Sequence, residues 1–237
     1  LKSAFSLVGL SAYLYVIVQI DAGLSKIIAL ISLGLILILN VFGVKKVGNT
    51  QLAIVSVSVI SLILVVLFGT NSFDSTLLSP VFSNGNHGFI SAVAFLYISY
   101  AGVTKVAAVA GEIKSPEKNL PRAMLISLFL ITTVYVFVAL ILVGNIDPSV
   151  LSKDIRPIYT LSQSLGGDLF GYIAGIIGVM TLLSMANSGV LASSRFPFAM
   201  ARDKMLPGFF GNVSSRFLTP VNSIFITCFI IGLAVFF

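Results

Sequence analysis

Polar residues interrupt the middle of one long apolar segment of the chain. Residues 88–111 read GFISAVAFLYISYAGVTKVAAVAG, with hydroxyl side chains, a glycine and a lysine near the centre. A glycine inside a helix costs about 1 kcal/mol relative to alanine, so a helix could be broken here. A broken helix offers free amides and carbonyls, which suit the carboxylate and ammonium groups of a zwitterion. We therefore predict substrate contacts at Ser99, Tyr100, Ala101 and Gly102. The alternative is an unbroken helix whose polar residues pack against other helices.

Lys105 is the only charged residue in that segment. A lysine in the centre of a bilayer costs about 2.5–3.5 kcal/mol on insertion scales. It could reach toward the edge of the membrane along its aliphatic stem. It could instead be a buried amine that exchanges protons or replaces a bound cation. The second interpretation makes Lys105 a coupling residue.

A second group of polar residues shares one face of the segment 169–192, which is otherwise apolar. Thr181, Ser184 and Ser188 lie at helical spacing on this face. Their hydroxyls could bind a coupling ion, or they could join helices, as Ser and Thr commonly do in membranes. Gly171 and Gly175 in the same segment predict close helix packing.

These polar groups are set in a very apolar chain. Of its 237 residues, 57% are hydrophobic and 9% are charged, whereas soluble domains carry about 25% charged residues. This composition excludes a soluble enzyme and a nucleic-acid partner, and it predicts a lipid bilayer as the surroundings. No segment pairs Asp, Glu or His for catalysis, so we expect no catalytic residues, no bound metal and no organic cofactor.

Seven apolar segments are long enough to cross a membrane as helices, which needs roughly 20 residues each. They lie at 3–20, 27–44, 49–69, 88–111, 123–144, 169–192 and 219–237. The expected fold is an all-α, polytopic membrane helix bundle that forms a single transmembrane domain over residues 1–237, truncated relative to a longer protein.

The basic residues indicate which loops face the cytoplasm. With alternating spans, ten Lys and Arg residues fall on one side and three on the other. The positive-inside rule assigns the richer side to the cytoplasm. It carries the loops 45–48, 112–122 and 193–218, and the last of these should lie along the membrane surface.

The loops contain recognisable helix signals. Asp147 before Pro148 predicts a capped helix start, and Asp74 could cap one turn. A short helix after Pro157 should end near Gly166-Gly167. In the loop 112–122, Ser115-Pro116 predicts a helix start and Pro121 a further break.

Two stretches resemble the amino acid/polyamine/organocation permeases. "YISYAGVTKVAAVAGEIKSPEKNLPRAM" is similar to their sixth helix and the loop that follows it, whose pattern is Glu-Val-Lys-x-Pro-x-x-x-x-Pro; this chain has Ile113 in place of the Val. "LLSMANSGVLASSRFPFAMARDKMLPGFFGNVSSRFLTP" is similar to their eighth helix and the next loop, with the pattern Ala-x-Ala-Arg-Asp-x-x-Leu-Pro. The matching residues here are Glu112, Lys114, Pro116, Pro121, Arg195, Ala199, Ala201, Arg202, Asp203, Leu206, Pro207, Arg216, Thr219 and Pro220.

The resemblance implies helices three to nine of a twelve-helix transporter with a five-plus-five inverted repeat. In that fold, 99–102 would be the unwound part of helix six. Some members similar to this chain carry a lysine in helix five that stands in for sodium. The corresponding region here, TQLAIVSVSVISL, offers only Ser56 and Ser58. Lys105 could take over that role.

The expected function is secondary active transport of amino acids or related small amines by alternating access. Na+ or H+ would be the coupling ion, and the expected location is the plasma (inner) membrane. Glu112, Lys114, Arg195 and Arg202 would form a cytoplasmic gate, pairing in one state and parting in the other. The alternative function is a polytopic membrane receptor or channel that transports nothing.

Overall fold

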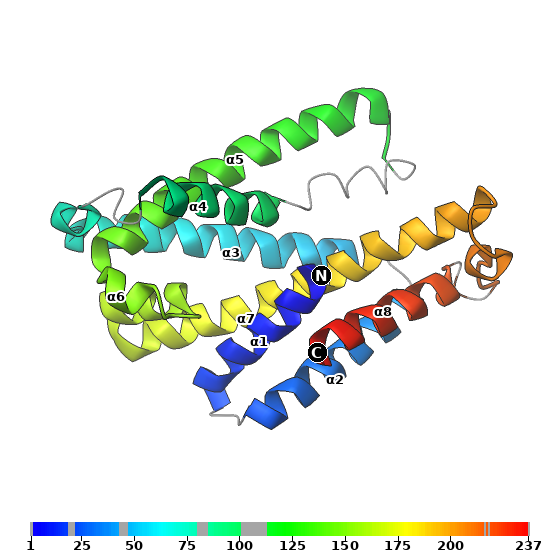
Figure 1. The fold of residues 1–237 in the computed structure, drawn as a ribbon, viewed down its shortest axis with the longest axis horizontal. Helices are drawn as coiled ribbons and strands as arrows, with labels where there is room; N and C mark the ends of the chain where they lie inside the picture. The colour runs from blue at the N-terminus through cyan, green and yellow to red at the C-terminus, as the bar shows by residue number, and fades with distance from the viewer. Residues whose placement is uncertain are drawn as a thin grey trace. The chain divides into compact units, whose positions relative to one another are not determined.

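The computed structural model describes residues 2–18, 22–42, 47–79, 85–100, 113–215, 217 and 219–236. Within these ranges the secondary structure is helical, with no strand (Figure 1). The prediction of an all-α fold is therefore confirmed. The long helices are α1 (Lys2–Val18), α2 (Ala22–Phe42), α3 (Val47–Gly69), α4 (Gly85–Tyr100), α5 (Pro116–Asn145), α7 (Pro157–Arg202) and α8 (Val221–Phe236).

A helix lies over the described part of each apolar segment. Among the described residues, four helical stretches are long and apolar enough to cross a membrane: Leu24–Phe42, Thr50–Ser72, Pro116–Asn145 and Pro157–Arg202. α8 is a shorter apolar helix. In the fourth segment the described helix is α4, and residues 101–112 lie outside the described ranges.

In the described part of the chain, Pro121 and Pro197 lie inside helices. α5 begins at Pro116 and continues through Pro121, so the predicted break at Pro121 was wrong. The proline lies in the second turn, where its missing N–H removes one intrahelical hydrogen bond and the rest of this 30-residue helix keeps its own. α7 likewise extends beyond residue 192, through Pro197, to Arg202.

The chain divides into two compact units. The first contains Leu1–Ser61 and Ser162–Phe237, and the second contains Leu62–Leu161.

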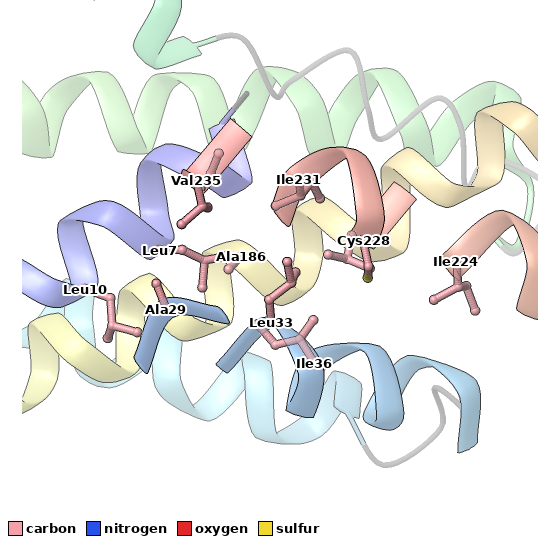
Figure 2. Close-up of a cluster of buried hydrophobic side chains, with 12 residues drawn as sticks. Leu7, Leu10, Ala29, Leu33, Ile36, Ala186, Ile224, Cys228, Ile231 and Val235 are labelled. Carbon is pink, nitrogen blue, oxygen red and sulfur yellow. The ribbon is translucent and has the colours of Figure 1, made fainter. Parts of the chain in front are cut away.

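The core of the first unit is built from four helices. Buried apolar side chains on α1, α2, α7 and α8 meet in one cluster, drawn in Figure 2. On α8 the members are Ile224, Cys228, Ile231 and Val235, and this spacing of three and four residues places them on one helical face. Because lipid tails are as apolar as leucine, close packing rather than escape from water would hold such a core together in a membrane.

Two glycines of α7 allow α1 to approach closely. A Cβ on Gly178 would come within 2.7 Å of the Tyr13 ring, and one on Gly189 would overlap the Ser3 side chain. Gly171 and Gly175, the pair predicted from the sequence, are also buried. Small residues on α7 therefore provide the surface against which α1 lies.

In the second unit, the end of α3 is fastened to the end of α5. Asn145 Nδ2 donates to the Gly69 carbonyl at 3.0 Å and to the Ile141 carbonyl at 2.9 Å. The Asp74 amide donates to the Gly144 carbonyl at 2.8 Å. The Phe73 ring lies so close to Gly144 that a Cβ there would overlap it. We call Gly69, Phe73, Asp74, Gly144 and Asn145 the loop clamp.

The predicted aspartate caps are confirmed. Asp147 Oδ1 accepts from the Ser149 amide at 2.8 Å at the start of α6 (Pro148–Leu151), and Asp74 Oδ1 accepts from the Thr76 amide at 2.8 Å at the start of η2 (Ser75–Leu78). Hydrogen bonds from Ser149 and Thr76, first from the side chains and then from the amides, hold the pKa of each carboxyl below its ordinary value.

The predicted short helix after Pro157 is also present. Gly167 has φ 75° and ψ −171°, which separates this helix from the long remainder of α7. The positive φ suits glycine, which has no Cβ to clash.

Candidate functional site

The predicted substrate-binding stretch is only partly described by the structure. Ser99 lies in α4, but its side chain is not among those described. Tyr100 is the last residue of α4. Ala101 and Gly102 lie outside the described residues, and so does Lys105. The predicted helix break therefore stays a prediction.

Tyr100 contacts α5 through both its hydroxyl and its ring. Its Oη lies 3.1 Å from Thr132 Oγ1. Its ring meets the Tyr135 ring edge-on, with centroids 5.9 Å apart and an interplanar angle of 62°. Our reading of the sequence missed Thr132 and Tyr135. The available signal was their spacing of three residues within the apolar run LISLFLITTVYVFVALIL, which puts two hydroxyls on neighbouring positions of one helical surface.

The hydroxyl face predicted on α7 lies against α3 within the first unit. Thr181 Oγ1 lies 2.5 Å from Ser58 Oγ and donates to the Ile177 carbonyl at 2.6 Å. Gln51 on α3 donates its side-chain N–H to Ser188 Oγ. Ser188 in turn donates to the carbonyl of Ser184 at 2.7 Å.

The neighbouring Asn187 points to a different helix. Its Oδ1 accepts a 2.6 Å hydrogen bond from Asn40 Nδ2 on α2, and that amide also donates to the Ile36 carbonyl at 2.8 Å. Both asparagines are buried. A hydrogen-bonded pair of buried amides fixes α2 against α7 at one register, because a shift of either helix would leave the polar groups unpaired.

Together these contacts form a polar ladder, which we define as Asn40, Gln51, Ser58, Thr181, Asn187 and Ser188. It joins α2, α3 and α7. The helix-joining role left open above accounts for the three bonds of the ladder that run between helices: Asn40 to Asn187, Gln51 to Ser188 and Ser58 to Thr181. The hydroxyl and carbonyl oxygens at Thr181 and Ser184 are also the oxygen type that alkali cations bind.

The three predicted gate residues that the structure describes lie near helix ends. Lys114 is exposed just before α5, and its carbonyl accepts from Asn119 Nδ2 at 2.6 Å. Arg195 lies within the last turns of α7, and Arg202 ends that helix. Arg202 Nε is 3.7 Å from Asp203 Oδ1, with both side chains mostly exposed. Such an exposed pair contributes little to stability. Glu112 lies outside the described residues.

Thr219 of the permease-like motif, and two residues shortly after it, connect helix ends in the first unit. Thr219 Oγ1 donates to the Val41 carbonyl of α2 at 2.9 Å. Ser223 and Asn222, at the start of α8, donate to the carbonyls of Phe210 and Phe209, both at 2.8 Å. Those carbonyls belong to the short helix η4 (Gly208–Gly211) that follows Pro207.

Comparison with known proteins finds one matching family and several similar proteins. A model of the amino acid permease family matches residues 3–237. The cationic amino acid transporter 4, vacuolar, of Arabidopsis thaliana is 30% identical over 80% of this chain and 32% of its own length. The serine/threonine exchanger SteT of Bacillus subtilis is 28% identical over 78% of this chain and 43% of its own length. The branched-chain amino acid permease BcaP of Lactococcus lactis is 26% identical over 86% of this chain and 45% of its own length. The chain thus spans less than half the length of these curated relatives.

Proposed function

Because the chain belongs to the amino acid permease family, we propose that it is part of a secondary active transporter for amino acids or related small amines. The family match along nearly the whole chain is the observation that carries this proposal. The relatives named above are transporters and permeases rather than enzymes. The match to permeases also disfavours the alternative of a receptor or channel.

The chain is part of an integral, multi-pass membrane protein, given the family and the long apolar helices. We propose the plasma (inner) membrane as its location, with the loops 45–48, 112–122 and 193–218 in the cytoplasm. The excess of Lys and Arg in these loops supports that orientation. Two relatives are named vacuolar and mitochondrial. The membrane in which the protein lies is therefore the first property to check.

The proposed mechanism is alternating access around a broken helix. Amides and carbonyls at residues 99–102 would bind the substrate's carboxylate and ammonium groups, since backbone freed from a helix is tolerated in a membrane where it lines a cavity. A five-plus-five inverted repeat would supply the moving and stationary parts. The packed core of α1, α2, α7 and α8 is suited to a part that moves as a rigid body.

Coupling would use Na+ or H+. For sodium, oxygens of Thr181, Ser184 and Ser188 would be ligands, after rearrangement of their present hydrogen bonds. For protons, the Lys105 amine would titrate. Lys105→Ala in the full-length protein should then abolish or alter the proton dependence of uptake, whereas Thr181→Val should weaken a sodium dependence. Intact pH-dependent uptake by Lys105→Ala would remove the proton role of this lysine.

The gate hypothesis assigns Glu112, Lys114, Arg195 and Arg202 to ion pairs that form in only one state of the transport cycle. Exchange of charge for a neutral side chain should shift the balance between the states. Glu112→Gln and Arg202→Gln should therefore change turnover. Normal turnover in both variants would rule the gate out.

The deciding experiment is uptake of radiolabelled amino acids by the full-length protein in proteoliposomes. Uptake should exceed that of empty liposomes, and an imposed proton or sodium gradient, or a counter-substrate inside, should increase it. A panel of cationic, branched-chain and hydroxylated amino acids should be used, because the relatives are named for all three classes. Uptake no faster than in empty liposomes for the whole panel would refute the proposal.

A further inference from the structure

The contact between Tyr100 and Thr132 joins α4 to α5 in the second unit, at an exposed position in an otherwise apolar stretch of α5. Thr132 lies near the middle of α5, with leucine, isoleucine, phenylalanine and valine around it in the sequence. In such surroundings a hydroxyl has few partners, so a hydroxyl-to-hydroxyl contact of 3.1 Å between helices holds both side chains in place.

The adjacent threonine behaves differently. Thr133 donates its hydroxyl to the Phe129 carbonyl at 2.9 Å, within α5 itself. Threonine commonly makes this bond to its own helix. Of the two successive threonines, therefore, Thr132 joins α5 to α4, and Thr133 serves as a matched internal comparison.

Tyr135 restrains the same tyrosine at a second point. It lies one turn after Thr132, and its ring meets that of Tyr100 edge-on. The orientation of a tyrosine side chain depends on two dihedral angles, and a ring contact together with a hydroxyl contact restricts both. Tyr100 is thus held at its ring and at its hydroxyl.

We propose that Thr132, supported by Tyr135, is a positioning residue for the substrate site: it holds Tyr100, and through it the end of α4, in the orientation that binds substrate. The inference rests on the proposed function, in which Tyr100 belongs to the substrate-binding stretch. Neither α5 residue needs to touch the substrate. Their effect is to reduce the freedom that Tyr100 would otherwise lose on binding.

The test measures uptake by the full-length protein in proteoliposomes with three single variants. Thr132→Val removes the hydroxyl at nearly constant shape, Thr132→Ser retains it, and Thr133→Val removes the neighbouring hydroxyl. We expect Thr132→Val to raise the KM about three- to tenfold, as for the loss of one neutral hydrogen bond. The maximal rate should change little, because the lost interaction acts on binding. The other two variants should retain the KM of the unaltered protein.

A purely structural role would give a different pattern. We expect Thr132→Val to lower the melting temperature measured without substrate only slightly, as for one hydrogen bond between membrane helices, and to lose part of the rise that the substrate produces. A fall in the substrate-free melting temperature with an unchanged KM would assign Thr132 to helix packing alone and overturn the inference. Equal KM values for Thr132→Val and the unaltered protein would overturn it as well.

Tyr100→Phe tests whether Thr132 acts through Tyr100. If it does, the double variant Tyr100→Phe/Thr132→Val should raise the KM no more than Tyr100→Phe alone. If the KM increase of the double variant instead equals the product of the two single increases, Thr132 acts independently of Tyr100, and a positioning role is refuted. If the unaltered protein transports no amino acid, the proposed function fails and the inference fails with it. If the unaltered protein transports amino acids and Thr132→Val has the same KM, the inference is refuted while the proposed function stands.

Discussion

The polar ladder of the first unit joins helices through bonds between side chains, whereas the loop clamp of the second unit fastens helix ends through bonds to backbone carbonyls. In the polar ladder, Asn40 meets Asn187 at 2.6 Å and Ser58 meets Thr181 at 2.5 Å. In the loop clamp, Asn145 donates to the Gly69 carbonyl at 3.0 Å, and the Gly144 carbonyl accepts from the Asp74 amide at 2.8 Å.

The difference follows from which backbone groups are free. In the middle of a helix each carbonyl already accepts an intrahelical bond, so a polar side chain that bonds to another helix there does so mainly through a side chain of that helix. At the end of a helix the last four carbonyls have no such bond. A nearby backbone or side-chain amide can donate a hydrogen bond to them. Asparagine therefore has two roles. In the first unit Asn40 and Asn187 fix the register of α2 against α7, and in the second unit Asn145 satisfies a carbonyl at the end of α3.

The loop clamp should be the more sensitive of the two regions, because it combines a hydrogen bond with a closely packed ring. Gly144→Val would place side-chain atoms where the Phe73 ring lies. Overpacking of this kind typically costs about 1–3 kcal/mol, which should appear as a lower melting temperature of the purified protein in detergent.

The matched control for this variant is Gly34→Val in α2, where a Cβ would meet nothing within 4 Å. It should leave the melting temperature nearly unchanged. Phe73→Ala combined with Gly144→Val should recover part of the loss. Equal stability of the two valine variants would show that the ring does not occupy the space above Gly144.

The asparagine pair of the polar ladder should give the next largest effect. Asn187→Leu leaves the buried Asn40 amide with one partner fewer, which costs about 1–3 kcal/mol when a polar group stays unsatisfied. The double variant Asn40→Leu/Asn187→Leu removes both amides, so it should be less destabilised than the sum of the two single variants. Melting temperatures of the four proteins complete this cycle. Additive losses would mean that the two amides do not interact.

Much of the fold could be predicted from the sequence because its signals are local. Asp147 before Pro148 predicts a cap from neighbouring residues alone, and the structure has that cap. Runs of apolar residues predict helices for the same reason. The predicted break at Pro121 was wrong. Proline usually ends a helix, but here the 30-residue helix continues through it despite the loss of one hydrogen bond.

The partners of polar side chains could not be predicted in this way. Thr181 and Ser188 were identified as one face of a helix, but Ser58 and Gln51, which meet them, are more than 100 positions away in the sequence. Helical periodicity indicates which residues share a face, and it contains no information about which helix covers that face. Thr132 was missed for this reason, since its importance depends on where Tyr100 lies.

The serine–threonine contact tests the weaker part of the polar ladder. Ser58→Ala removes a side-chain hydrogen bond between α3 and α7, and such bonds in membrane proteins average about 0.6 kcal/mol. Ser56→Ala is the matched control, because Ser56 is exposed on the same helix while Ser58 is buried. We expect a small fall in melting temperature for Ser58→Ala only. An equal fall in both variants would attribute the effect to helix propensity instead of the contact with Thr181.

The smallest effect should come from the cap at Asp147, which makes its hydrogen bonds in an exposed loop. Its lowered pKa reflects bonds to the charged carboxylate from Ser149, so the cap contributes stability above the ordinary aspartate pKa of about 3.9. That contribution is lost as the pH falls through the lowered pKa. The difference in melting temperature between the unaltered protein and Asp147→Ala should be constant above about pH 5 and vanish in stronger acid.

Ser149→Ala keeps the amide donor but removes the hydroxyl, so a carboxyl titration followed by NMR should show the pKa of Asp147 moving back up. An unmoved titration would mean that the backbone amide of Ser149 alone lowers the pKa of the Asp147 carboxylate.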